Sequence, residues 1–307
     1  MPSVISHWLL GKRVLPLLRE REDLVLKERC FLWGCQGPDI LNYHKLMPWR
    51  GGTNLRRFVK PLHEVDPSVL FSALASPPAQ LRGELSDHHT SYALGMCCHY
   101  ALDSIVEPYI ERLEDHLRKT DPRGKKYNYR ADIESALDVM LLRHDKNLLP
   151  DEIKLVDCVP TGRSTSDAVS LEISYIIESM FGVCLAEGSA KRLANDVRTA
   201  MHLMNDPHGR RKGVVSSVEK LVNVSGGKTS SYFRPMVEDL ECDYANLLHG
   251  EWSPISDPSR VSRDDYFMMA DKAEKYFFTV ADIFLNALRE GEKCSIPDFD
   301  NDGGDLL

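Results

Sequence analysis

Apolar residues recur at helical spacing along most of this chain, and sustained apolar–polar alternation is scarce. Apolar positions at i, i+3, i+4 and i+7 form one face of a helix, whereas a half-buried strand needs a period of two. Proline and glycine gather between these segments, where they end helices and form turns. The pattern predicts an all-α fold: a single multi-helix domain with an additional helical portion towards the C-terminus. The expected helices cover residues 4–19, 66–76, 87–119, 130–145, 167–187, 188–206, 213–223, 231–249 and 262–291.

The order of these segments suggests how the chain is organised. We expect residues 1–150 to form a helical core that carries the functional site, and residues 151–292 to add helices packed on the same fold. A chain of 307 residues is long enough for one large domain of this kind. The last stretch, 293–307, is acidic and glycine-rich, so we expect a flexible tail there.

Charge and hydropathy exclude several classes of protein. A net charge of −8 gives no reason to expect an extended nucleic acid as partner. No apolar run approaches the roughly 18 residues of a membrane-spanning helix, and the first residues lack the order of a signal peptide. The eight cysteines include no CxxC pair, which predicts reduced, mostly buried thiols. We therefore expect a cytoplasmic protein without a transmembrane segment, and the oligomeric state stays open.

The segment CCHYALDSIVEPYI places His99, Asp103 and Glu107 four residues apart. On a helix these side chains form one stripe, each about a turn above the last. Imidazole nitrogen and carboxylate oxygen are ligands that zinc accepts, and an aspartate can bridge two ions. The spacing also occurs by chance, and the aspartate could simply orient a buried histidine. The stripe alone favours the second interpretation.

Further ligands would have to come from outside this helix. His7 lies early on the first amphipathic helix, Asp39 follows the Gly37-Pro38 turn, and His63 precedes an expected helix. Each also has an ordinary interpretation as a solvent-facing histidine or a capping aspartate, so the hypothesis depends on their combination.

Other residues near these candidates are interpreted without a metal. His88 and His89 lie three turns before the central stripe and are expected to be surface or capping residues. A group of aromatic side chains either lines an apolar rim or belongs to the core, and the core is favoured. These aromatic residues are Trp8, Trp33, Tyr43 and Trp49.

Three stretches together resemble one known family. They are GCQGPDIL, GMCCHYALDSIVEPYI and the later NLLHGEW. In these the chain is similar to bacterial zinc-dependent phospholipase C and its cytosolic relatives. The resemblance implies an all-α core with a cluster of up to three zinc ions. It implies metal ligands at His7, Asp39, His63, His99 and Asp103, with Asp103 bridging two ions.

The chain departs from that family at two positions. Glu107 stands where relatives have a histidine before Pro-Tyr, and Arg130 stands four residues before Glu134, where relatives have a histidine. Arginine is permanently cationic and cannot ligate zinc. Either Glu107, Arg130 and Glu134 form an ionic triad in place of a third metal, with Arg130 near substrate phosphate, or both glutamates hold a metal and Arg130 turns outward. The first alternative predicts two zinc ions, the second three.

The chemistry that the resemblance implies is hydrolysis of a phosphoric ester by a hydroxide bridging two, or three, zinc ions, with Asp39 orienting it. The expected substrate is a phospholipid head group or another small phosphate ester, a nucleotide included. The alternative is a non-catalytic helical metal-binding protein of the same fold, with a degraded third zinc site.

Overall fold

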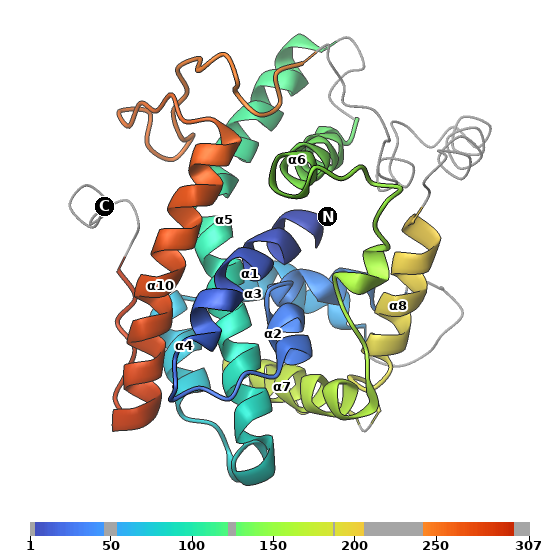
Figure 1. Ribbon diagram of the computed structural model, residues 1–307, viewed down its shortest axis with the longest axis vertical. Coiled ribbons are helices and arrows are strands. Elements are labelled where there is room, and N and C mark those ends of the chain that lie inside the picture. Colours follow the sequence, from blue (N-terminus) through green and yellow to red (C-terminus); the bar gives the residue numbers. More distant parts are fainter. Residues whose placement is uncertain (1–3, 46–53, 122–126, 187, 206–241, 298–307) are drawn as a thin grey trace.

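The computed structural model describes residues 4–45, 54–121, 127–186, 188–205 and 242–297, and this part of the chain forms helices and no β-strand. The all-α prediction is confirmed (Figure 1). The α-helices are α1 (Val4–Arg19), α2 (Glu28–Gly34), α3 (Val59–His63), α4 (Pro67–Ala75), α5 (Ser86–Thr120), α6 (Tyr129–Lys146), α7 (Arg163–Phe181), α8 (Leu193–Met204) and α10 (Tyr266–Glu290). Among the short 3₁₀ helices, η1 (Gly37–Tyr43) and η2 (Leu55–Phe58) lie near the candidate site.

Local sequence signals fix where several helices begin and end. Asp66, Asn128 and Asp265 are N-caps whose side chains accept from the backbone N–H of Ser68, Ala131 and Met268. These bonds satisfy donors that have no partner inside the helix. At their C-termini α6, α7 and α10 are followed by a residue in the left-handed conformation, respectively Asn147, Gly182 and Gly291.

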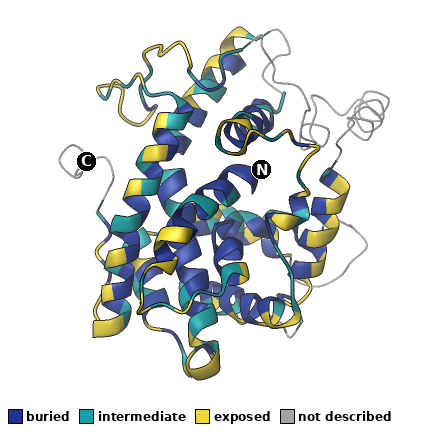
Figure 2. Ribbon diagram, in the orientation of Figure 1, coloured by how far each residue is buried: buried dark blue, intermediate teal, exposed yellow. Residues whose placement is uncertain are grey.

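The long helix α5 is the axis around which the other helices pack. Its 35 residues continue through Pro108, so the proline does not end the helix. The helices α2, α1, α6, α7 and α10 all contact it, and Figure 1 shows α10 running alongside. The buried faces of these helices meet along α5 (Figure 2). One continuous apolar core therefore joins the first helix to the last.

Two glycines allow α2 to lie against α5 at backbone distance. A Cβ atom on Gly34 would come within 2.1 Å of the carbonyl oxygen of Tyr92, and one on Gly95 within 2.1 Å of that of Phe31. Any larger residue would push the two helices apart. This contact fixes where the chain leaves α2 and enters η1, the segment that carries Asp39.

The aromatic residues that the structure describes belong to the core, as the sequence favoured. Trp33 and Tyr43 are fully buried, and Trp8 is partly buried against the core. Trp49 lies outside the described residues. No described helix combines the length and the apolar character that crossing a membrane would require.

Several sequence predictions differ from the structure. The helix predicted over 231–249 is wrong for residues 242–249, which form turns because the side chains of Asp243 and Asn246 bond to the local backbone. The rest of that segment and the helix predicted over 213–223 lie outside the described residues. Within the segment expected to be a flexible tail, residues 293–297 lie against α4, where Cys294 and Ile296 are buried and donate backbone hydrogen bonds to serines.

His89 is not the surface or capping residue that we expected. It is 1% exposed, its Nδ1 lies 3.0 Å from Glu172 Oε2, and its Nε2 lies 2.8 Å from the carbonyl oxygen of Leu74. An acceptor beside each nitrogen favours the imidazolium form of the ring, which would donate to both and link α4, α5 and α7. Burial lowers the pKa of His89, but the hydrogen bond and charge of Glu172 outweigh it, so the pKa is raised above 6.5.

We predict that Glu172→Gln lowers the free energy of unfolding by about 3–5 kcal/mol at pH 6, because it leaves a buried charge unpaired. A raised histidine pKa stabilises the fold fully below the unfolded pKa, and this contribution is lost as pH rises through the folded pKa. The difference between wild type and variant in urea unfolding should therefore shrink above pH 6.5. His88→Gln, at the half-buried neighbouring position, serves as control. An equal difference at pH 6 and at pH 9 would contradict the assignment of an imidazolium.

Candidate metal centre

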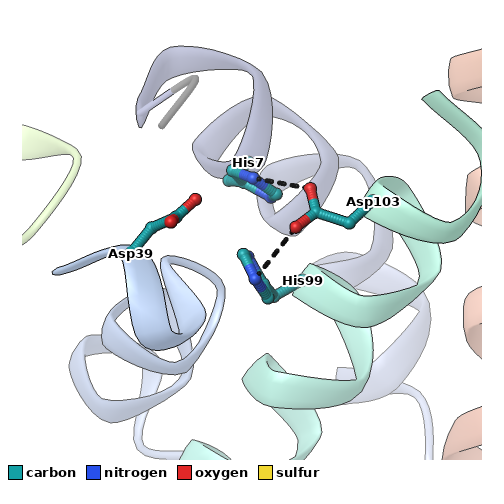
Figure 3. Close-up of side chains that lie close together, drawn as sticks. All are labelled: His7, Asp39, His99 and Asp103. Atoms are coloured by element: carbon teal, nitrogen blue, oxygen red, sulfur yellow. Dashed lines mark ion pairs between the residues drawn. The ribbon is translucent and has the colours of Figure 1, made fainter. Parts of the chain in front are cut away.

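Four residues from three separate segments form a group that could hold a metal ion. They are His7 of α1, Asp39 of η1, and His99 and Asp103 of α5. One ligand atom from each lies within 4.8 Å of all the others. In Figure 3 both imidazoles point toward the Asp103 carboxylate, and Asp39 faces the group from the opposite side.

Asp103 occupies the middle of the group. Its two oxygens lie 3.3 Å from His7 Nε2 and 3.1 Å from His99 Nε2. A third imidazole, His63, places its Nε2 3.6 Å from an oxygen of Asp103 and 3.6 Å from an oxygen of Asp39. Asp103 therefore lies among three imidazoles, and its bridging of two ions stays a prediction.

His63 lies at the edge of the four-residue group, with a side chain 33% exposed. It is the last residue of α3 and, as the sequence predicted, it precedes the next helix, α4. Its Nδ1 lies 2.9 Å from the carbonyl oxygen of Val59. A hydrogen bond from Nδ1–H to a carbonyl leaves the Nε2 lone pair for a metal, the tautomer that metal-binding histidines commonly adopt.

The electrostatics of these side chains show how strongly they interact. Burial raises the pKa of Asp39 to about 6, with the Asp103 charge adding to it and His63 opposing it. Burial lowers the pKa of His99 to about 3, and repulsion from His7 and His63 reinforces the shift. Burial lowers the pKa of His63, but the two aspartates outweigh this effect and raise the pKa to about 9.

Asp103 itself stays ionised. Burial alone would raise its pKa, but the surrounding imidazoles hold the pKa of this carboxyl well below its usual range. The group thus combines an ionised carboxylate with a neutral His99 imidazole, whose buried Nε2 lies 3.1 Å from Asp103 but outside hydrogen-bond geometry. Neutral imidazole and ionised carboxylate are the protonation states in which these residues ligate metals, so Asp103 and His99 already fit a divalent ion. His7 and His63, whose pKa values are raised, would release a proton on binding it.

The structure brings together Glu107, Arg130 and Glu134, and the three side chains form an ionic triad. The Arg130 guanidinium pairs with Glu107 of α5, and its Nε lies 2.8 Å from Glu134 Oε1 one helical turn along α6. This is the first of the two arrangements that the sequence left open. Neither glutamate belongs to the four-residue group. Burial raises the pKa of Glu107 to about 7, with the negative charge of Asp103 adding to the shift and Arg130 opposing it.

The group lies in the wall of a cleft of about 740 Å³. Asp39, His63, His99 and Asp103 contribute to its lining, and so do all three members of the triad. Other parts of the lining are apolar and include Leu70, Phe71, Met96 and Tyr100. A ligand in this cleft would meet the candidate metal group and apolar side chains together.

Two supporting contacts were not predicted from the sequence. Asp138, fully buried on α6, accepts hydrogen bonds from Ser6 N at 2.8 Å and Ser6 Oγ at 2.7 Å. Gln36 donates to the carbonyl oxygen of Val4 at 3.2 Å. Both hold the first turn of α1, which presents His7. The available signal was spacing: Asp138 follows Glu134 by four residues on α6.

Comparison with known proteins gives no match, whether to family models, to curated proteins or to solved structures. Membership of the zinc-dependent phospholipase C family stays a prediction from the motifs.

We predict that Gly37→Ala weakens metal binding at least tenfold. Gly37 has a φ of +54°, and a Cβ atom there would lie 2.2 Å from the His99 ring, which would have to move. Gly83 is the matched control, because its φ is +65° and a Cβ atom on it would meet nothing within 4 Å. Each alanine costs about 1 kcal/mol of backbone strain, so a loss of metal affinity beyond that of Gly83→Ala reports the displacement of the His99 ring. Titration calorimetry with Zn²⁺ measures it, and equal affinities would contradict the role of Gly37.

We predict that Asp138→Ala weakens metal affinity about 10-fold to 100-fold, as is typical for residues that orient ligands. It should also destabilise the fold by about 2–4 kcal/mol, because backbone and hydroxyl donors bonded to a buried carboxylate lose their acceptor. Asp132→Ala, on the same helix but away from the cleft lining, is the control. Unfolding and Zn²⁺ titration are compared for both variants. Metal affinity unchanged in folded Asp138→Ala would contradict the positioning of His7.

Proposed function

We propose that the protein is a metal-dependent hydrolase of phosphoric esters, similar in action to phospholipase C. The observation that carries the proposal is that imidazole and carboxylate donors from α1, η1 and α5 converge on one point in the wall of a large cleft. Perturbed ionisable groups gathered in a cleft favour a functional site over a structural one.

We propose two zinc ions as the cofactor. His7, Asp39, His99 and Asp103 would hold one ion, and His63, which lies 3.6 Å from an oxygen of each aspartate, offers a donor for another. Mixed imidazole and carboxylate donors suit zinc. Bound divalent ions would supply Lewis acidity towards phosphoryl oxygens and activate water near neutral pH.

The side chains around the centre would position the substrate. The apolar residues of the cleft would receive the alkyl or aromatic part of an ester while its phosphate faces the donor cluster. This division supports a phospholipid head group or a small phosphate ester as substrate. Arg130 borders the same cleft and, though paired with two glutamates, keeps a fixed positive charge there. Cytoplasmic location stays a prediction.

One observation favours the non-catalytic alternative. The Arg130 guanidinium is paired on two sides, so its charge is already compensated by Glu107 and Glu134. A substrate phosphate would have to compete with these carboxylates for it. A helical protein that binds metal without turnover would show the same pairing, and only activity separates the two functions.

We predict that the purified protein, loaded with Zn²⁺, hydrolyses bis(p-nitrophenyl) phosphate, and that Asp103→Asn abolishes both the hydrolysis and most of the bound metal. The substitution removes the carboxylate charge that three imidazoles share. Asp115→Asn, on the same helix but outside the cleft lining, should leave metal content and rate unchanged.

Two results would contradict this function. Bound metal without hydrolysis of phosphodiesters, phosphomonoesters or phospholipids would favour the non-catalytic protein. Absence of bound metal after reconstitution would rule out the metal centre itself. Release of p-nitrophenolate and elemental mass spectrometry are the two measurements.

A further inference from the structure

The ionic triad next to the candidate centre contains one cation and two carboxylates. Arg130 pairs with Glu107 and Glu134, whose side chains are 32% and 6% exposed. Glu107 lies one helical turn beyond Asp103 on α5, so the triad continues the line of carboxylates that begins in the metal group. The guanidinium is the positive charge that compensates this end of the line.

A small cavity is bordered by residues of both the triad and the metal group. Its volume is about 10 Å³, close to the space that one water molecule or ion needs. Asp39, Asp103, Glu107 and Glu134 all line it. His7, whose buried Nδ1 forms no hydrogen bond with the described part of the chain, lines it as well. The cavity thus offers carboxylate oxygens and an imidazole to any cation that enters.

Arg130 pairs with both glutamates that line this cavity. Arginine keeps its charge at all relevant pH values and holds carboxylates in fixed geometry, but it offers no lone pair to a metal. While it pairs with the two glutamates, a divalent ion gains less from binding them, because their charge is already compensated. Without the guanidinium, two partly desolvated carboxylates would face each other and would need either a proton or another cation.

We propose that Arg130 acts as a built-in cation that limits how many divalent ions the centre holds, so that neutralising residue 130 lets Glu107 and Glu134 bind one more. The inference rests on the metal centre proposed above for its setting. It concerns the difference in bound ions between the wild type and a variant at residue 130, however, and that difference can be measured separately from the function of the centre.

The experiment measures Zn²⁺ bound per chain at saturation, by equilibrium dialysis and elemental mass spectrometry. Arg130→Gln removes the charge, Arg130→His removes it at pH 8 and adds an imidazole, and Arg130→Lys retains a cation. Arg118→Gln is the matched control, since it removes an arginine paired with Glu114 on the surface of α5. Near-UV circular dichroism identifies the variants that fold, and either neutral variant is sufficient for the test.

The expected result is about one additional Zn²⁺ per chain in Arg130→Gln and Arg130→His, with no gain in Arg130→Lys or Arg118→Gln. Adding Glu107→Gln to Arg130→Gln should remove the gain. Equal stoichiometry in wild type and both neutral variants would overturn the inference, while metal bound by the wild type would leave the proposed centre standing. A gain in the variants with none in the wild type would support the inference and overturn the native centre.

Discussion

The backbone contact between α2 and α5 is the constraint on which the candidate centre depends. Because Gly34 and Gly95 lack side chains, the two helices meet at a distance that no other residue permits. The chain then leaves α2 and enters η1 beside the His99 ring, where Gly37 again leaves room. Asp39 reaches the metal group from this segment. A local packing requirement therefore determines the position of a ligand.

Charge compensation is the second constraint on the site. It involves the imidazoles around Asp103 and, one turn further along α5, the guanidinium of Arg130. Asp103 faces three imidazoles, which keep it ionised despite burial. One turn along α5 the Glu107 carboxylate faces a guanidinium instead. Buried charges are tolerated only when they are paired, so each carboxylate of this stripe needs a cation. Along α5 the partners of the carboxylates thus change from imidazoles, which can lose a proton, to a guanidinium, whose charge is permanent.

How far the sequence predicted this structure depended on whether the interactions were local. Helical period located α1, α5, α6 and α10 closely, and spacing placed His99, Asp103 and Glu107 on one stripe. Neither signal shows which segments meet. The grouping of His7, Asp39 and His63 with that stripe was inferred from a resemblance and is seen only in three dimensions. His89 was misjudged for the same reason, since its partner Glu172 is 83 residues away.

The candidate centre is more exposed to solvent on one side than on the other. His7 and His99 are 2% and 4% exposed, and Asp138 and Gly37 fix the segments around them, whereas a third of the His63 side chain is exposed. Rigid, buried ligands on one side would hold an ion in place. The side bordered by His63 and the cleft would be where ligands exchange, because there a molecule from solvent can approach. Rearrangement at α3 would then change access to the centre without disturbing the ligands of α1 and α5. A metal held equally on all sides by buried residues would have a structural role, and this asymmetry is what favours a reactive one.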